Sequence, residues 1–154
     1  MPTLAEIGLV RAAVPRAATF ADAAEVLSES GVAMIAVVDE REEVVGMFGG
    51  EELLRGLFPR YLDELRHTAF ARDDIAGLLR RANEAQAEPV ERYMRDAVTV
   101  EADASATHVA ERFLHCGLPT LAVVRERRFE GVVDRVRFAR AMIVAGGLDA
   151  GDEA

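Results

Sequence analysis

The chain of 154 residues contains no lysine and no tryptophan, and its only cysteine is Cys116. A single cysteine excludes an internal disulfide framework and fits a reducing compartment, so we expect a cytoplasmic protein. The absence of lysine excludes Schiff-base catalysis and a P-loop, because both need a lysine amine. The longest uninterrupted hydrophobic run, residues 32–38, is far shorter than the roughly 20 residues that cross a bilayer, so we expect no direct membrane insertion.

Acidic residues outnumber basic ones, with 27 Asp and Glu against 18 Arg and a net charge of −9. Such a surface repels a polyanion at long range, so we expect no nucleic-acid partner. Hydrophobic residues make up 51% of the chain, which is enough for a folded core at this length. The composition therefore predicts a globular, non-membrane protein.

The charge is unevenly distributed along the chain. Residues 8–58 contain four arginines and nine acidic residues, whereas residues 117–144 contain six arginines and three acidic residues. One interpretation is an anion pocket, or a surface for an acidic partner, around Arg135, Arg137 and Arg140. The other is a solvated turn and a polar helix face that complement the acidic first part or a dimer mate.

The chain contains an internal repeat. When residues 14–41 are set against residues 100–127, an offset of 86, ten positions are identical, and after a one-residue deletion the offset becomes 85. The identical residues of the first copy are Val14, Ala18, Ala24, Glu25, Gly31, Ala36, Val37, Val38, Glu40 and Arg41. We therefore predict one unit at 8–58, a second at 89–145, an insert at 59–88 between them, and a frayed, disordered tail at 146–154.

Each copy predicts the order strand, helix, strand, strand, helix, which is an α+β fold. Thr19 and Ser105 are predicted to cap the first helices, and Gly31 and Gly117 to end them. The predicted strands are 10–14, 33–38 and 44–48 in the first copy and 97–100, 119–124 and 129–133 in the second. The second helices are predicted at 50–58 and 134–144, with Asp134 as an N-cap, and the insert is helical by propensity.

The repeat resembles a tandem pair of cystathionine-β-synthase (CBS) domains, the Bateman module. The residues that carry the resemblance are Val90-Glu91-Arg92-Tyr93-Met94, Val98-Thr99-Val100, residues 117–124 (GLPTLAVV), residues 31–39 (GVAMIAVVD), Gly46 and Glu52-Leu53-Leu54. The resemblance implies two units related by a pseudo-twofold axis, dimerisation of such pairs, and clefts that bind adenine nucleotides or adenosyl compounds. It also implies a regulator that is not an enzyme.

In nucleotide-binding members of that family, the return strand is followed by Gly-apolar-apolar-Thr/Ser-x-x-Asp, whose hydroxyl and carboxylate hold the ligand. Here the first copy has Gly49 and Glu52 at those two positions, and the second has Asp134 and Arg137. Glu52 retains a carboxylate that can accept a ribose hydroxyl, whereas Arg137 only donates and suits a phosphate or carboxylate. The resemblance adds Val98 and Thr120 to this set of predicted binding residues.

No catalytic or metal-binding constellation is predicted. His108 and His115 share a helix face but are separated by about 10 Å of helical rise, and Cys116 has no CxxC partner. The sequence therefore predicts a homodimeric sensor that binds a small anionic effector, with AMP, ADP, ATP or S-adenosylmethionine as candidates, and signals to a regulated enzyme or transporter. The alternative is a ligand-free interaction or dimerisation module with degenerate clefts and the insert as its docking surface.

Overall fold

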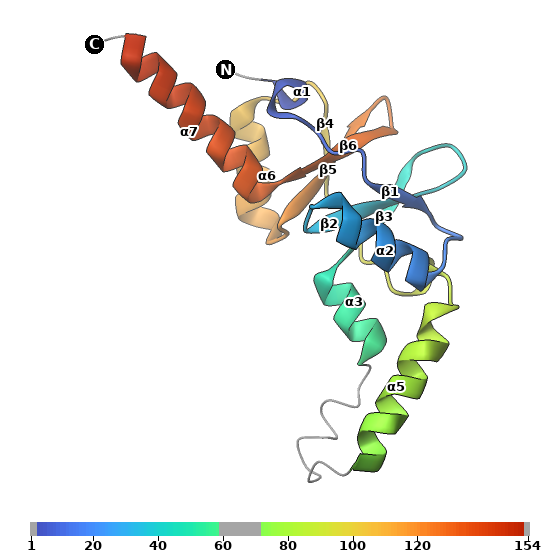
Figure 1. Cartoon of the computed structure of the whole chain (residues 1–154). Helices are drawn as coiled ribbons and strands as arrows, with labels where there is room; N and C mark the ends of the chain where they lie inside the picture. Colours follow the sequence, from blue (N-terminus) through green and yellow to red (C-terminus); the bar gives the residue numbers. More distant parts are fainter. Residues whose placement is uncertain (1–2, 59–71, 153–154) are drawn as a thin grey trace.

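The computed structural model describes residues 3–58 and 72–152, and Figure 1 shows the course of the chain. Its helices are α1 (Leu4–Ile7), α2 (Phe20–Ser30), α3 (Gly50–Leu57), α5 (Arg72–Gln86), α6 (Ala106–Cys116) and α7 (Arg135–Asp152), with a 3₁₀ turn at Val90–Arg92. Its strands are β1 (Ala13–Pro15), β2 (Met34–Val38), β3 (Val44–Gly49), β4 (Thr99–Glu101), β5 (Thr120–Arg125) and β6 (Arg128–Asp134).

The strands form two sheets of identical topology, ordered β1-β2-β3 and β4-β5-β6. In each sheet the first pair of strands is parallel and the second pair is antiparallel. The pairing Ala13↔Ala36 recurs as Thr99↔Ala122, with both residues displaced by 86. The predicted α+β fold of two β-α-β-β-α units is thus confirmed.

The change of offset from 86 to 85 arises in the hairpin turns. Between β2 and β3 the turn holds three residues, 40–42, inside the bond from Asp39 N–H to the Glu43 carbonyl, and Glu42 has φ 61°. Between β5 and β6 the turn holds only Glu126 and Arg127, whose φ values are 51° and 71°. Two-residue turns with both φ values positive match the twist of a hairpin, so the second copy closes with one residue fewer.

The ends of the first helix in each unit agree with the sequence. The Thr19 hydroxyl accepts a hydrogen bond from Asp22 N–H, and the Ser105 hydroxyl accepts one from His108 N–H, both at 3.1 Å. Gly31 and Gly117 follow these helices with φ values of 71° and 70°, a left-handed conformation that glycine adopts without a steric penalty.

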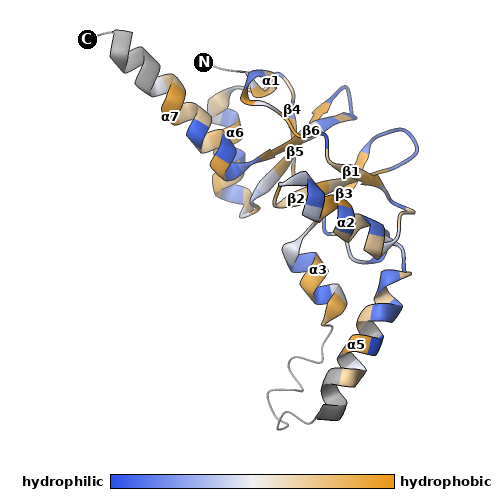
Figure 2. Cartoon of the chain, in the orientation of Figure 1, coloured by the Kyte–Doolittle hydropathy of each residue, from blue (hydrophilic) through white to orange (hydrophobic). Residues whose placement is uncertain are grey.

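The core consists of the strands and the helix faces that cover them, and Figure 2 shows hydrophobic residues concentrated in the strands. Each unit also inserts its leading segment into the other. Val90, which is fully buried, packs in the core of the first unit, and Leu4 of α1 packs in the core of the second. Backbone hydrogen bonds between Val10 and Val132, and between Arg95 and Met47, accompany the exchange.

Three features differ from the sequence-based expectations. Helix α1, with a capping box between Thr3 and Glu6, was not expected. Asp134 ends β6, and its carboxylate accepts hydrogen bonds from Thr120 and Ala33 instead of capping α7. Helix α7 continues to Asp152, so the tail expected to fray from residue 146 is helical as far as it is described.

The insert is helical in its second half, where α5 lies beside α3 and α2. Its first part, residues 59–71, lies outside the described residues, and so do Tyr61, Leu62, Leu65 and Ala69, which were expected to supply apolar faces. Ala85 is buried, whereas Leu79 leaves 63% of its surface exposed. Within residues 3–58 and 72–152, no helix combines the length and hydrophobicity needed to span a bilayer.

Candidate functional site

Two cavities lie at matching positions of the two units. The first, cleft A, has a volume of about 300 Å³, and the second, cleft B, about 490 Å³. Cleft A is lined by Val10, Gly31, Val32, Val132, Asp134, Val136, Arg137 and Arg140, and cleft B by Met94, Arg95, Asp96, Val98, Cys116 and Leu118. Val32 and Leu118 are 86 residues apart, so the two clefts are repeats of one another.

Beside cleft B, the carboxylate of Glu52 is already engaged within the protein. The side chain is buried, one of its oxygens accepts a hydrogen bond from Gly49 N–H at 3.0 Å, and the other lies 3.4 Å from Arg95 Nη1. The same Arg95 nitrogen also pairs with Glu51 at 3.1 Å. Glu52 therefore caps the start of α3 and, together with Glu51, offsets the charge of Arg95 through one of its guanidinium nitrogens.

Gly49 has no room for the hydroxyl side chain that the family motif carries at this position. A Cβ atom placed there would lie 2.8 Å from the carbonyl oxygen of Ala33 and 2.7 Å from Cγ of Met34. Because one of these atoms belongs to the backbone, the clash cannot be relieved by rotating a side chain. The motif positions beside cleft B thus lack the hydroxyl, and the Glu52 carboxylate is engaged by Gly49 and Arg95.

In cleft A, Asp134 joins the two units. Its carboxylate accepts a hydrogen bond from the Thr120 hydroxyl at 2.6 Å and another from Ala33 N–H at 3.1 Å. Thr120 belongs to the second unit and is fully buried, whereas Ala33 belongs to the first unit. The repeat-related positions are Pro119, which has no N–H, and Gly49, which has no side chain, so cleft B cannot form the corresponding bond.

Arg137 and Arg140 give cleft A its charge. Both side chains are exposed, they lie three residues apart on α7, and neither forms an ion pair with an acidic residue in the described part of the chain. Among the described residues that line the cleft, Asp134 supplies the only negative charge, and its oxygens already accept hydrogen bonds. Two guanidinium groups at one cleft make a favourable site for a phosphate or carboxylate.

The arginines of the β5–β6 hairpin stand apart from this cleft. Arg125 donates to Glu130 at 2.6 Å, and that hydrogen bond raises the pKa of the Arg125 guanidinium. Arg127 lines a separate surface hollow beside Glu43 and Glu101. The positive charge of the second unit is therefore divided between a solvated turn and an arginine pair at cleft A.

The six residues predicted for the site are split between the two clefts. Thr120 and Asp134 are in direct contact, and Arg137 lines the same cleft as Asp134. Gly49 and Glu52 contact each other beside cleft B, and Val98 lines that cleft. Sequence reasoning missed Arg95, and it treated Arg140 only as part of a charged patch, because their roles depend on contacts between distant segments.

Comparisons with known proteins match this architecture. The family model described as "CBS domain" matches residues 11–58 and 90–144. A CBS domain-containing protein from Kribbella flavida superposes with a TM-score of 0.69 at 16% identity, covering 89% of this chain and 94% of that one. The CBS domain of a membrane protein from Sphaerobacter thermophilus gives 0.66 at 20% identity, covering 87% and 83%.

A third structure, a CBS domain-containing protein from Bacillus anthracis, gives a TM-score of 0.67 at 18% identity, covering 92% of this chain and 93% of that one. At such identities the likeness extends to the fold alone. No curated protein matches the sequence.

Proposed function

The chain belongs to the CBS domain family, whose members are commonly regulatory modules, and we propose that it is a non-catalytic sensor with one working effector site, cleft A. The observation that carries this proposal is the contrast between the two clefts. In cleft A, Arg137 and Arg140 have no acidic partner among the described residues, whereas in cleft B Arg95 is paired with Glu51 and Glu52. A small anion gains charge-assisted hydrogen bonds only at cleft A.

The proposed ligand is held by its anionic group. AMP, ADP and ATP carry phosphates that suit two arginines, and S-adenosylmethionine carries a carboxylate. A ribose diol finds poor acceptors here, because Asp134 is engaged by Thr120 and Ala33 and because Arg137 only donates. The phosphate or carboxylate, and not the ribose, is therefore the anchor in this proposal.

The proposed signal is a change in how the two units sit against each other. Cleft A has walls from both units, and Asp134 bonds across them to Ala33. A ligand that binds one arrangement of the units better than another shifts the population by its difference in affinity. We propose that a homodimer of the chain passes this shift to a regulated enzyme or transporter in the cytoplasm.

Thermal melting tests the proposal, with AMP, ADP, ATP, S-adenosylmethionine and inorganic phosphate as probes. A ligand at 100 times its Kd stabilises the folded state by about 2.7 kcal/mol, which raises Tm by several degrees for a chain of this size. The variant Arg137→Gln should lose the shift. Arg135→Gln, on the same helix but outside the cleft lining, is the matched control and should keep it. If no probe raises Tm, or if Arg137→Gln shows the same rise in Tm as the unaltered chain, the proposal is overturned.

Exposed leucines favour one second candidate, a ligand-free dimerisation module that uses the insert. Leu54 of α3 and Leu79 of α5 are exposed by 59% and 63%, and these two helices contact each other. If this candidate is correct, the double variant Leu54→Asp/Leu79→Asp sediments as a monomer, whereas the unaltered chain sediments as a dimer. In addition, none of the ligand probes raises Tm. An unchanged sedimentation coefficient would reject it.

A further inference from the structure

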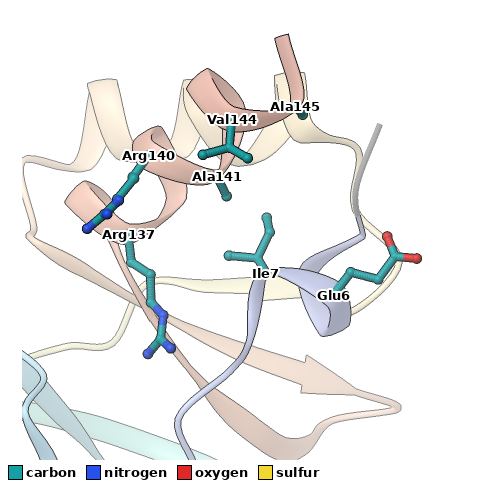
Figure 3. A pocket seen from close by; sticks show the side chains of 7 residues that line it. All are labelled: Glu6, Ile7, Arg137, Arg140, Ala141, Val144 and Ala145. Carbon is teal, nitrogen blue, oxygen red and sulfur yellow. The ribbon is translucent and has the colours of Figure 1, made fainter. Parts of the chain in front are cut away.

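A second cavity adjoins cleft A, between α1 and α7, and has a volume of about 390 Å³. This α1–α7 cavity lies within the range of roughly 300–1,000 Å³ typical of small-molecule sites. Its apolar walls are formed by Ile7, Ala141, Val144 and Ala145. Figure 3 shows Ile7 of α1 facing Ala141 of α7 across the cavity.

The α1–α7 cavity and cleft A share two lining residues, Arg137 and Arg140. In Figure 3 the Arg137 side chain extends past Ile7, whereas the Arg140 side chain projects from α7 away from Ile7. The Arg137 guanidinium lies against the backbone at Gly8, with its Nη2 atom 3.5 Å from the place that a Cβ at that residue would take. The arginine pair therefore borders both the α1–α7 cavity and cleft A.

The acidic residue at the α1–α7 cavity does not neutralise the arginines. Glu6 accepts a hydrogen bond from Thr3 N–H at 2.7 Å as part of the capping box of α1. Its side chain points away from Arg137 and Arg140 in Figure 3. The cavity thus combines an apolar interior with a cationic end, which is the complement of an amphipathic anion.

We propose that the ligand of this site is an amphipathic anion, whose head group binds Arg137 and Arg140 and whose aliphatic chain fills the α1–α7 cavity. This inference rests on the proposed function for the head group and goes beyond it by naming the ligand class. Glu6 and Ile7 precede the first segment that matches the family model, residues 11–58. The α1 wall of the site therefore lies outside the matched segments, whereas Ala141 and Val144 of the α7 wall lie within the second one.

The probes that test this inference are inorganic phosphate and the monoalkyl phosphates with two, four and eight carbons. Each methylene buried in the cavity contributes about 0.8 kcal/mol, close to a fourfold gain in affinity. Octyl phosphate should therefore bind at least tenfold more tightly than ethyl phosphate. The uncharged 1-octanol, which lacks the head group, should bind at least tenfold more weakly than octyl phosphate.

Two variants locate the aliphatic chain. Ala141→Phe fills the cavity and should abolish the dependence on chain length, whereas Ala139→Phe, on an exposed position of the same helix that does not line the cavity, should leave it unchanged. Val144→Asp alters a residue that is already 54% exposed and should also abolish the dependence without unfolding the protein. Melting of each variant without ligand verifies its fold.

The outcomes separate this inference from the proposed function. If phosphate and ethyl phosphate bind in an Arg137-dependent way but a longer chain adds no affinity, the chain assignment is wrong and the anion site stands. If octanol binds as tightly as octyl phosphate, the head group is wrongly assigned. If no anion binds, or if Arg137→Gln leaves binding unchanged, both proposals fail.

Discussion

Asp134 is the residue on which the contact between the two units depends at cleft A. Its carboxylate satisfies the Thr120 hydroxyl, which is fully buried, and the Ala33 N–H of the other unit. Removing a partner from a buried donor costs about 1–3 kcal/mol. We expect Asp134→Ala to lower the free energy of unfolding by that amount in a urea titration.

A double-mutant cycle with Thr120→Val checks the cause of this loss. In the Thr120→Val background the buried donor is already gone, so Asp134→Ala should cost measurably less than in the unaltered chain. An equal cost in both backgrounds would mean that the Thr120–Asp134 hydrogen bond contributes nothing to stability.

Tyr93 gives stability a dependence on alkaline pH. Burial of its side chain, with the hydrogen bond that its hydroxyl donates to Glu88 at 2.7 Å, raises the pKa of Tyr93 to about 12 from 10.0. A pKa that is higher in the folded state stabilises the fold fully below pH 10, and this contribution disappears as the pH rises from 10 to about 12.

The measurement is Tm between pH 9 and pH 12 for the unaltered chain and for Tyr93→Phe. The chain has no lysine, so no ammonium group titrates in this window. We expect Tyr93→Phe to show a shallower decline above pH 10. Parallel declines in the unaltered chain and Tyr93→Phe would show that the Tyr93 proton does not contribute.

At the scale of elements, Gly56 sets how closely α3 approaches α2. A Cβ on Gly56 would lie 2.8 Å from Cζ of Phe20 and 3.0 Å from Cδ1 of Tyr93, and those two rings are themselves packed with centroids 4.8 Å apart. Overpacking of this kind costs about 1–3 kcal/mol. Gly56→Ala should therefore destabilise the protein, even though alanine is the better helix former.

Gly77 of α5 provides the matched control for this substitution. Among the residues that the structure describes, and apart from the adjoining residues and the backbone of its own helix, no atom lies within 4 Å of the Cβ that alanine would add there. Gly77→Ala should raise the free energy of unfolding by about 0.5–1 kcal/mol, because only the helix propensity changes. If urea titrations showed that Gly56→Ala and Gly77→Ala change the free energy of unfolding in the same direction, the close packing of α3 on α2 would be contradicted.

Elements were predictable from the sequence where their signals are local. Thr19, Ser105, Gly31 and Gly117 mark helix ends by their own chemistry, and the offset of 86 falling to 85 reproduces the strand registers. The bounds shifted where tertiary contacts decide them. The strand expected at 10–14 corresponds to β1, which begins only at Ala13, because Val10 pairs with Val132 of the other unit.

At the scale of the whole molecule, the leading segments exchange between the units, and the sequence did not reveal this. Leu4 reaches the core of the second unit and Val90 that of the first, although neither carries a local signal for its destination. The asymmetry of the clefts was predictable in part. The altered motif residues are visible in the sequence. The contacts of the Glu52 carboxylate with Gly49 N–H and Arg95 can be seen only in the folded chain.

The central claim is that cleft A alone binds an anion, and nuclear magnetic resonance of the nitrogen-labelled chain tests it most directly. The titrant is whichever of AMP, ADP, ATP, S-adenosylmethionine, inorganic phosphate and octyl phosphate raises Tm most. We expect saturable shifts of the amide resonances of Gly31, Val32 and Arg137, with those of Asp96 and Leu118 unmoved. Saturable shifts at Asp96 and Leu118 instead, or none at either cleft, would contradict it.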